Sequence, residues 1–219
     1  MSQRYSIVWQ GSFFFARACA YISEIVAIVF LSSTLLLAEG PAQSSPNDKD
    51  LEIQNKLETH RKLLQQTPAS KDALANKLSQ ETEPKVRVGL LALLSATHLK
   101  AESVGTIEPY LNDADPLVRS QAVITLGALG GRQVVNDLKT VLQDDENSGV
   151  RSAAAFWLGS LKDPSAASAL GQAMQDDADG NVRAQAANSL KQLATPSAKS
   201  LLKQGQNDSD VRVRKMANE

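Results

Sequence analysis

Five arginines recur at a nearly constant spacing from residue 87 onward, and each follows a valine. They are 32, 32, 32 and 31 residues apart: Arg87, Arg119, Arg151, Arg183 and Arg214. The residue four places before each arginine is an acid or an amide: Glu83, Asp115, Asn147, Asp179 and Asp210. A row of guanidinium groups could bind anions along one surface, whereas a carboxylate paired with each arginine would neutralise the row. The regular pairing therefore favours a structural role over an anion-binding stripe.

The other residues that could do chemistry do not form a catalytic or metal-binding pattern. His60 falls on an apolar stripe and His98 ends a predicted helix, and neither has a partner at metal-ligand spacing. Acidic clusters recur in equivalent inter-repeat turns, where carboxylates cap helices: Asp113/Asp115, Asp144-Asp145-Glu146 and Asp176-Asp177/Asp179. The sequence has no glycine-rich phosphate loop and no G-x-S-x-G motif. We therefore expect no enzymatic activity, no metal and no cofactor.

The charge balance argues against nucleic acid as a general partner. Lys and Arg together number 23 and Asp and Glu 24, which gives a formal net charge of −1. Proteins that track a phosphate backbone usually carry a strong basic excess. The single cysteine, Cys19, stands before the repeats, so the repeats themselves contain no disulfide and no thiol nucleophile.

A second series predicts that each unit of about 32 residues holds two helices. Thr67-Pro68, Asp163-Pro164 and Thr195-Pro196 fall in one frame of this length. Thr or Asp followed by Pro is typical of an N-cap with Pro in the first helical turn. Each unit is thus helix A, which runs from the acidic cap through Val-Arg to a leucine, then a turn and helix B. Four apolar positions of helix A lie within about 80° of one another on a helical wheel, and this face is predicted to pack on helix B. In one repeat the four positions are Val118, Ala122, Leu126 and Leu129.

The pattern D-x-x-V-R-x-x-A-x-x-x-L-G-x-L resembles the short HEAT repeats of the phycobilin-lyase type, over about residues 84–219. The resemblance implies an all-α fold, a right-handed α-solenoid of stacked antiparallel helix pairs, with about four to five repeats. The helix pair at 51–80 would be a divergent first repeat. In such repeats the acid and arginine positions form a structural ladder between neighbours. The resemblance implies that role for Arg87, Arg119, Arg151, Arg183, Asp115, Asn147, Asp179 and Asp210.

The adjacent aromatic residues Phe156 and Trp157 are the only individual residues in the sequence that suggest a binding surface. After residue 43 the only other aromatic is Tyr110. Phe156 stands five residues after the arginine of its repeat, roughly opposite the apolar face of helix A, and Trp157 falls on the margin of that face. Ala92 and Ile124 occupy the positions equivalent to Phe156. Together these four residues are a candidate partner-docking surface, with packing inside an irregular stack as the alternative.

The first fifty residues have the order of an export signal. Arg4 and Arg17 precede an apolar run from Ile25 to Ala38, which small residues follow. This order is typical of a secretory signal peptide, with an uncleaved membrane anchor as the alternative. The predicted organisation is a signal peptide or anchor at 1–42, a disordered linker at 43–50 and the repeat domain at 51–219. The predicted location is the bacterial periplasm, either free or anchored to the inner membrane and facing the periplasm.

The function expected from this organisation is a non-catalytic protein-binding scaffold or adaptor. Its partner would be another protein, and a membrane would take part only through an uncleaved N-terminal segment. The helix B face would be polar, with Lys139, Lys203, Asp137 and Glu108 among its residues. Two alternatives stay open: a chromophore- or cofactor-handling protein like the phycobilin lyases, and a membrane-anchored assembly factor.

Overall fold

The computed structural model describes residues 48–66, 70–95 and 104–218, and every element in these ranges is a helix. The chain divides into two compact units, residues 1–54 and 55–219. Of the first unit only residues 48–54 are described, and they form the start of a helix. The predicted signal peptide or anchor at 1–42 lies outside the described residues. Within the described part of the chain, no helix is long and apolar enough to cross a membrane.

The first described helix, α2 (Asp48–Gln66), begins inside the segment 43–50 that the sequence predicted as a linker. Asp48 and Asp50 stand in its first turn, where the positive end of the helix dipole favours carboxylates. The next helix, α3 (Ser70–Gln80), buries Leu74 and Leu78. These two helices form the pair that the sequence predicted as a divergent first repeat.

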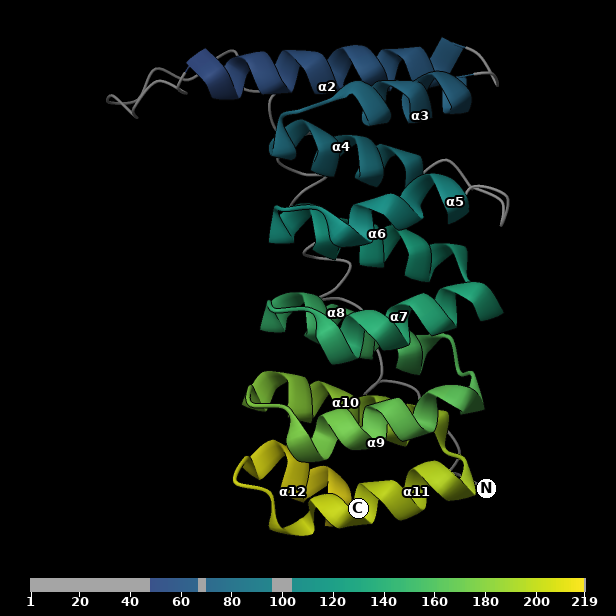
Figure 1. Ribbon diagram of the computed structural model, residues 1–219, viewed down its shortest axis with the longest axis vertical. Coiled ribbons are helices and arrows are strands. Elements are labelled where there is room, and N and C mark those ends of the chain that lie inside the picture. The colour runs from purple at the N-terminus through teal and green to yellow at the C-terminus, as the bar shows by residue number, and fades with distance from the viewer. Residues whose placement is uncertain (1–47, 67–69, 96–103, 219) are drawn as a thin grey trace, which may run out of the picture. The chain divides into compact units, whose positions relative to one another are not determined.

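The remaining helices alternate between helix A and helix B of successive repeats (Figure 1). Helix A is represented by α4 (Pro84–Ser95), α6 (Pro116–Leu129), α8 (Ser148–Ser160), α10 (Gly180–Leu193) and α12 (Val211–Asn218). Helix B is represented by α5 (Val104–Ile107) with the 3-10 helix η3 (Glu108–Asn112), α7 (Arg132–Asp144), η4 (Pro164–Ala166) with α9 (Ala167–Asp176), and α11 (Pro196–Leu202) with η5 (Lys203–Asn207). Each helix A packs on the helix A of the next repeat, so residues 84–218 form the predicted all-α solenoid.

The helices begin where the cap pattern predicts. The side chain of Asp115 accepts a hydrogen bond from the Leu117 N–H at 2.8 Å, and Asp179 does the same with the Asn181 N–H at 2.7 Å. At the start of a helix B, Thr195 accepts from the Ala198 N–H at 3.1 Å. Each cap satisfies an N–H group that has no partner inside its own helix, and so fixes the first turn.

The core is a continuous column of small and branched apolar side chains. In α6 the predicted face buries Val118, Ala122 and Leu126 completely, while Leu129 at its end is half-buried. The same three positions are buried in α4, α8 and α10: Val86, Leu90, Leu94, Val150, Ala154, Leu158, Val182, Ala186 and Leu190. Since one helix pair cannot bury such a face alone, the repeats are stable only as a stack.

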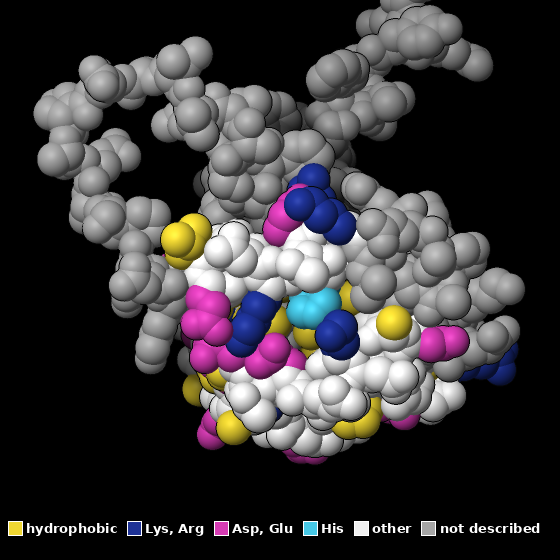
Figure 2. Space-filling view, turned by 90° about the horizontal axis from the view of Figure 1, so that it is seen from above, with side chains coloured by type: hydrophobic (Ala, Val, Ile, Leu, Met, Phe, Trp, Pro, Cys, Tyr) yellow, Lys and Arg dark blue, Asp and Glu magenta, His cyan; other side chains and the backbone are white. Residues whose placement is uncertain are grey.

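His60 on α2 is buried in the first helix pair, with 8% of its surface exposed. Its Nδ1 has no hydrogen-bond partner among the described residues. Burial lowers the pKa of His60, and the nearby charge of Lys77 lowers it further, against the opposite effect of Glu81. Figure 2 shows the molecule from above, with side chains of both charge signs on this face. The first helix pair therefore buries a histidine whose lowered pKa favours the neutral ring, and the described residues offer its Nδ1 no partner.

Candidate functional site

Four of the five arginines bind an aspartate of the following repeat. The pairs are Arg87–Asp113, Arg119–Asp145, Arg151–Asp177 and Arg183–Asp208. In the last three pairs Nε and Nη2 of the arginine donate to the two carboxylate oxygens, at 2.8–3.2 Å. This two-point geometry matches the planar fork of a guanidinium to a carboxylate. Each arginine therefore joins two neighbouring repeats.

The same arginines are also tied to the backbone of their own repeat. Nη1 of Arg151 donates to the carbonyl of Asp145 at 2.8 Å, and Nη1 of Arg183 donates to the carbonyl of Asp177 at 3.0 Å. Asp145 thus binds Arg151 through its carbonyl and Arg119 through its carboxylate. Because this pattern repeats, one hydrogen-bonded ladder runs from Arg87 to Arg214 without a break.

The acids of this ladder are not the ones that the resemblance implied. The four residues expected in that role are the caps of their own helices: Asp115, Asn147, Asp179 and Asp210. Asp210 also binds the exposed side chain of Arg212 in its own helix. A cap points its oxygen at the N–H groups of the following turn, so it does not reach the arginine of the preceding repeat.

The true ladder acids stand two residues before each cap: Asp113, Asp145, Asp177 and Asp208. Each also accepts a hydrogen bond from the backbone N–H of its cap residue, as Asp177 does from Asp179 at 2.9 Å. Their recurrence was visible in the sequence, six residues before the arginine of the same repeat. Spacing alone could not choose between the two acidic series, because the choice depends on which one faces the neighbouring repeat.

The ladder charges are buried and neutralise one another. In the Arg119–Asp145 pair the two side chains are 7% and 5% exposed. The hydrogen bonds that Arg119 donates to Asp145 raise the pKa of Arg119 despite its burial. Burial alone would raise the pKa of Asp177, but hydrogen bonds from Arg151 and from the Asp179 amide outweigh it and lower that pKa. These groups are thus fully used in holding the repeats together and do not form an anion site.

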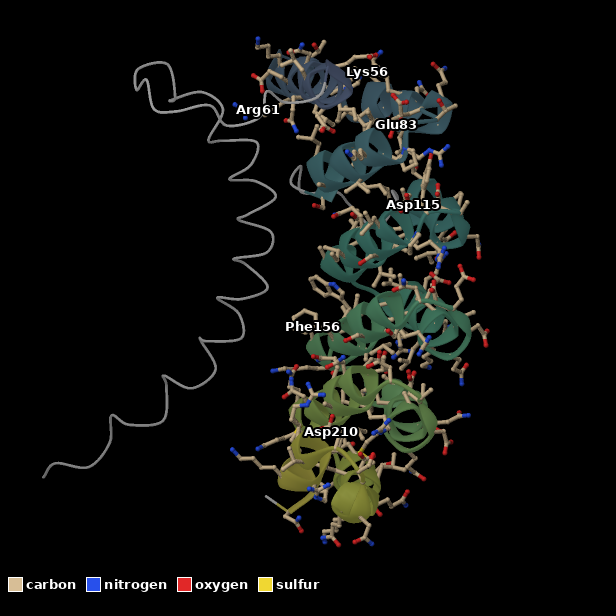
Figure 3. The ribbon with its side chains drawn as sticks, turned by 90° about the vertical axis from the view of Figure 1, so that its left-hand side faces the viewer. Lys56, Arg61, Glu83, Asp115, Phe156 and Asp210 are labelled. Carbon is tan, nitrogen blue, oxygen red and sulfur yellow. The ribbon has the colours of Figure 1, made fainter. Side chains whose placement is uncertain are left out.

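The predicted apolar surface lies on three successive helices, with Ala92 on α4, Ile124 on α6 and Phe156 on α8. All three are half-buried, as is Trp157. The rings of Phe156 and Trp157 meet edge to face, with centroids 5.5 Å apart and planes at 81°. Figure 3 shows Phe156 at the outer edge of the stack. We call these four residues the aromatic surface.

Trp157 explains why Phe156 is less exposed than the helical wheel predicted. A methyl group placed on Gly127 would lie 2.2 Å from the Trp157 ring, so the indole packs directly on the backbone of α6. In that position its ring also covers one side of Phe156. The wheel treats a helix as isolated, whereas here the neighbouring side chain bridges two repeats. The indole is therefore part of the packing between α6 and α8.

The helix B surface is polar, and its side chains are linked from one repeat to the next. Gln143 donates to Gln172 at 3.4 Å, and Lys139 donates to Ser165 at 3.1 Å. Asp137 is half-buried, and burial raises its pKa, followed by the charge of Glu108. Its Oδ2 has no hydrogen-bond partner within the described part of the chain.

Two grooves of about 410 and 420 Å³ lie where helix B of one repeat meets the next repeat. Charged, amide and aliphatic side chains line them, and neither lining includes an aromatic side chain. Pigment sites are mostly apolar and aromatic, so these grooves do not suit a chromophore. His98 lies outside the described residues. Among those described, no three His, Cys, Asp or Glu side chains are grouped as metal ligands would be.

Comparison with known proteins agrees with the observed repeats. The sequence matches the family of HEAT repeats over residues 72–156 and 140–219. Among solved structures, the CpcE–CpcF complex of phycocyanin lyase from Nostoc sp. PCC7120 is similar, with 19% identity and a TM-score of 0.54, over 83% of this chain and 79% of that chain.

Human deoxyhypusine hydroxylase in complex with glycerol is also similar, with 18% identity and a TM-score of 0.44, over 93% of this chain and 96% of that one. At these identities the likeness concerns the fold alone. No curated protein matches the chain. The two family matches together cover well over half of the sequence, and this chain therefore belongs to the HEAT-repeat family.

Proposed function

We propose that this chain is a protein-binding scaffold whose partner docks on the aromatic surface. The observation that carries the proposal is the placement of Phe156 and Trp157. They are two of the three aromatics after residue 43, and they stand side by side at the edge of the stack. Aromatic side chains at such positions are the usual anchors of protein interfaces.

The surroundings of this pair support the same conclusion. Ile124 and Ala92 extend the apolar surface across two further repeats, while the equivalent position on α10 is the polar Asn188. The apolar area is therefore bounded, as a docking area is, rather than continued along the whole stack. The ladder meanwhile fixes the spacing of the helices, so a partner would meet a rigid surface and its binding would require little ordering.

The similarity in fold to phycocyanin lyase gives a more general argument for a protein partner. The phycocyanin lyase structure is a complex of two chains, CpcE and CpcF. A chain of similar fold can thus work in association with another protein. The identity of the partner does not follow from that likeness.

We also propose, from the sequence alone, that the protein is exported to the periplasm. The basic start, the apolar run at 25–38 and the small residues after it support this location. Sequencing the N-terminus of the native protein separates the two forms: a new start near residue 39 or 43 indicates a cleaved signal peptide. An intact N-terminus in the membrane fraction indicates an anchored assembly factor, and an intact N-terminus in the cytoplasm refutes export.

A second candidate function is the handling of a bilin-like chromophore, which the fold likeness to phycocyanin lyase favours. The lack of aromatic side chains in the linings of both grooves argues against it. An absorbance titration with a free bilin tests it directly. A saturable spectral change at equimolar ratio would support this candidate over the scaffold.

The scaffold is tested by affinity capture from the native envelope with wild type, Phe156→Ser and Leu117→Ser. Leu117 is a matched control, because it is a 65% exposed apolar residue on α6 outside the aromatic surface. Circular dichroism first checks that all three are equally folded. A partner retained by wild type and Leu117→Ser but lost by Phe156→Ser supports the proposal. Equal recovery by all three variants would move the binding site to another surface.

A further inference from the structure

The outward side of helix A carries no charged residue in three successive repeats. It consists of the residues one, five and nine places after the ladder arginine, which lie roughly opposite the core face of the helix. The described residues at these places on α4, α6 and α8 are half-buried or exposed, and we call them the uncharged face: Val88, Ala92, Ser120, Ile124, Ala128, Ser152, Phe156 and Ser160. Charged residues make up 21% of the chain, and the side of a helix that faces water normally carries them. The composition of this side is therefore that of a surface that becomes covered.

The hydroxyl group next to Phe156 needs no partner from outside its own helix. Ser160 donates a hydrogen bond from its Oγ to the carbonyl of Phe156 at 3.0 Å. At the end of α4, Ser95 donates in the same way to the carbonyl of Ala92 at 2.8 Å. Covering these two hydroxyls with another protein would therefore leave no donor unpaired.

Side-chain size increases along the middle row of the uncharged face, from Ala92 through Ile124 to Phe156. Helix α4 packs on α6, and α6 packs on α8. The three residues are 32 positions apart in the repeat, so Ile124 lies between the other two. If an identical face is turned by 180° about an axis through Ile124, each Phe156 lies over the Ala92 of the other copy. A large side chain then meets a small one on both sides of the axis, which fills space without overlap.

The charge and the area of this face also suit a second copy. Two identical faces without charged residues bring no like charges together. Three helices about 20 Å long and about 9 Å apart present roughly 550 Å². Two copies would thus bury about 1,100 Å² in total, which is at the lower end of specific protein interfaces. A two-fold pair of this size is expected to be reversible.

The aromatic anchor of this face is held in position before binding. The ring of Phe156 meets the ring of Trp157 edge to face, and the Trp157 ring packs on the backbone of α6 at Gly127. Figure 3 shows Phe156 at the edge of the stack. An anchor that is already ordered loses little conformational freedom when it is covered.

We propose that the partner of the aromatic surface is a second copy of this chain, which binds through the uncharged face with two-fold symmetry. The axis passes through Ile124, and Phe156 of each copy packs on Ala92 of the other. The inference rests on the proposed function and names the partner of that same site.

Sedimentation velocity of the full chain over a range of concentrations tests whether the dimer forms. We expect a reversible dimer with a Kd in the micromolar range, as for other small interfaces. Phe156→Ser should raise this Kd at least about tenfold, as loss of an aromatic anchor does. Gln143→Ser, at an exposed position of the helix B surface, is the control and should leave the Kd unchanged. Circular dichroism checks that all proteins are equally folded.

Paired charges test the two-fold geometry itself. Ala92→Glu and Phe156→Lys should each weaken the dimer, because each buries an unpaired charge. The chain that carries both substitutions should dimerise more strongly than either single variant, since each introduced carboxylate meets the introduced amine of the other copy. Ala92→Glu combined with Ile124→Lys is the control and should show no recovery, because the axis brings the two introduced amines together.

A wild-type chain that stays monomeric, or a dimer that Phe156→Ser does not weaken, would overturn the inference. Recovery by the Ile124→Lys combination instead of the Phe156→Lys combination would also overturn it. These outcomes are separate from those of the capture experiment. If the chain is monomeric but captures a different protein through Phe156, the proposed function stands and this inference falls. If capture recovers the native chain itself and Phe156→Ser abolishes this recovery, both are supported.

Discussion

The carboxylate of Asp145 accepts hydrogen bonds from Nε and Nη2 of Arg119 at 2.8 and 3.0 Å, across the boundary between two repeats. Both side chains are almost fully buried. Burying two charges costs free energy, which the pair offsets through its own attraction and the further bonds to backbone groups. Removal of either partner would leave the other as an uncompensated buried charge.

A double-mutant cycle on Arg119 and Asp145 should therefore show strong coupling. We expect Arg119→Ala and Asp145→Ala each to lower the free energy of unfolding by about 3–5 kcal/mol. The double variant should lose much less than the sum, because it leaves no unpaired charge. Urea denaturation followed by circular dichroism measures all four proteins.

The control for this cycle is Arg212→Ala, since the Arg212–Asp210 pair has a 51% exposed arginine. It should cost about 0–1 kcal/mol, as exposed ion pairs usually do. Strict additivity of the two ladder substitutions would show that the buried contact does not couple the repeats.

Gly127 should be intolerant of a side chain although it stands inside a helix. Alanine in place of glycine normally stabilises a helix by about 1 kcal/mol. Here the added methyl group would lie 2.2 Å from the Trp157 ring, so the indole must move. We expect Gly127→Ala to lower the free energy of unfolding by about 1–3 kcal/mol, in the range of overpacked cores.

Gly105→Ala on α5 is the matched control for this substitution, because a methyl group there has no heavy atom within 4 Å. It should leave stability unchanged or slightly increased. Thermal unfolding of both variants provides the comparison. Similar behaviour of the two would mean that Trp157 does not pack on α6.

His60 should make the stability of the protein depend on pH in the mildly acidic range. Burial, and then the charge of Lys77, lower the pKa of His60 below its ordinary value near 6.5. The unfolded chain therefore binds the proton more readily than the folded one. The free energy of unfolding should be at its full value above about pH 6.5 and fall as the pH drops through the lowered pKa of the folded state.

His60→Leu removes this titration and the unpaired ring nitrogen, so the variant should lose less stability than wild type between pH 7.5 and 5.5. Urea midpoints at several pH values in this range give the two slopes. The ladder lowers the pKa of Asp177 and Asp208, so these two aspartates do not contribute to the slope in this range. Identical slopes for both proteins would show that the pKa of His60 is the same in the folded and the unfolded chain, which would contradict this prediction.

The repeat architecture could be predicted from the sequence because its signals are local. The Val-Arg spacing predicted the period, and the caps Asp115 and Asp179 predicted where helices begin. Each of these depends on the backbone of one turn or on the period of one helix. The structure confirms the all-α solenoid and the helix pairs that follow from them.

The inter-repeat contacts could not be predicted in the same way. Asp113 and Asp115 recur with the same period, and only the packing of one repeat on the next decides which of them faces Arg87. The exposure of Phe156 is a similar case, because it depends on where the Trp157 ring comes to rest against α6. The choice of ladder acid and the exposure of Phe156 both depend on contacts with the neighbouring repeat, which the residue pattern of a single helix does not show.

The most direct test of the central claim is the free energy that Phe156 contributes to folding. A docking residue should be largely dispensable for the stack, whereas a packing residue should not. We expect Phe156→Ala to lower the free energy of unfolding by about 1–2 kcal/mol, since the side chain is half-buried and leaves little cavity. A loss of about 3–5 kcal/mol, as for a fully buried phenylalanine, would show that the residue holds the repeats together and would contradict the aromatic surface as a docking site.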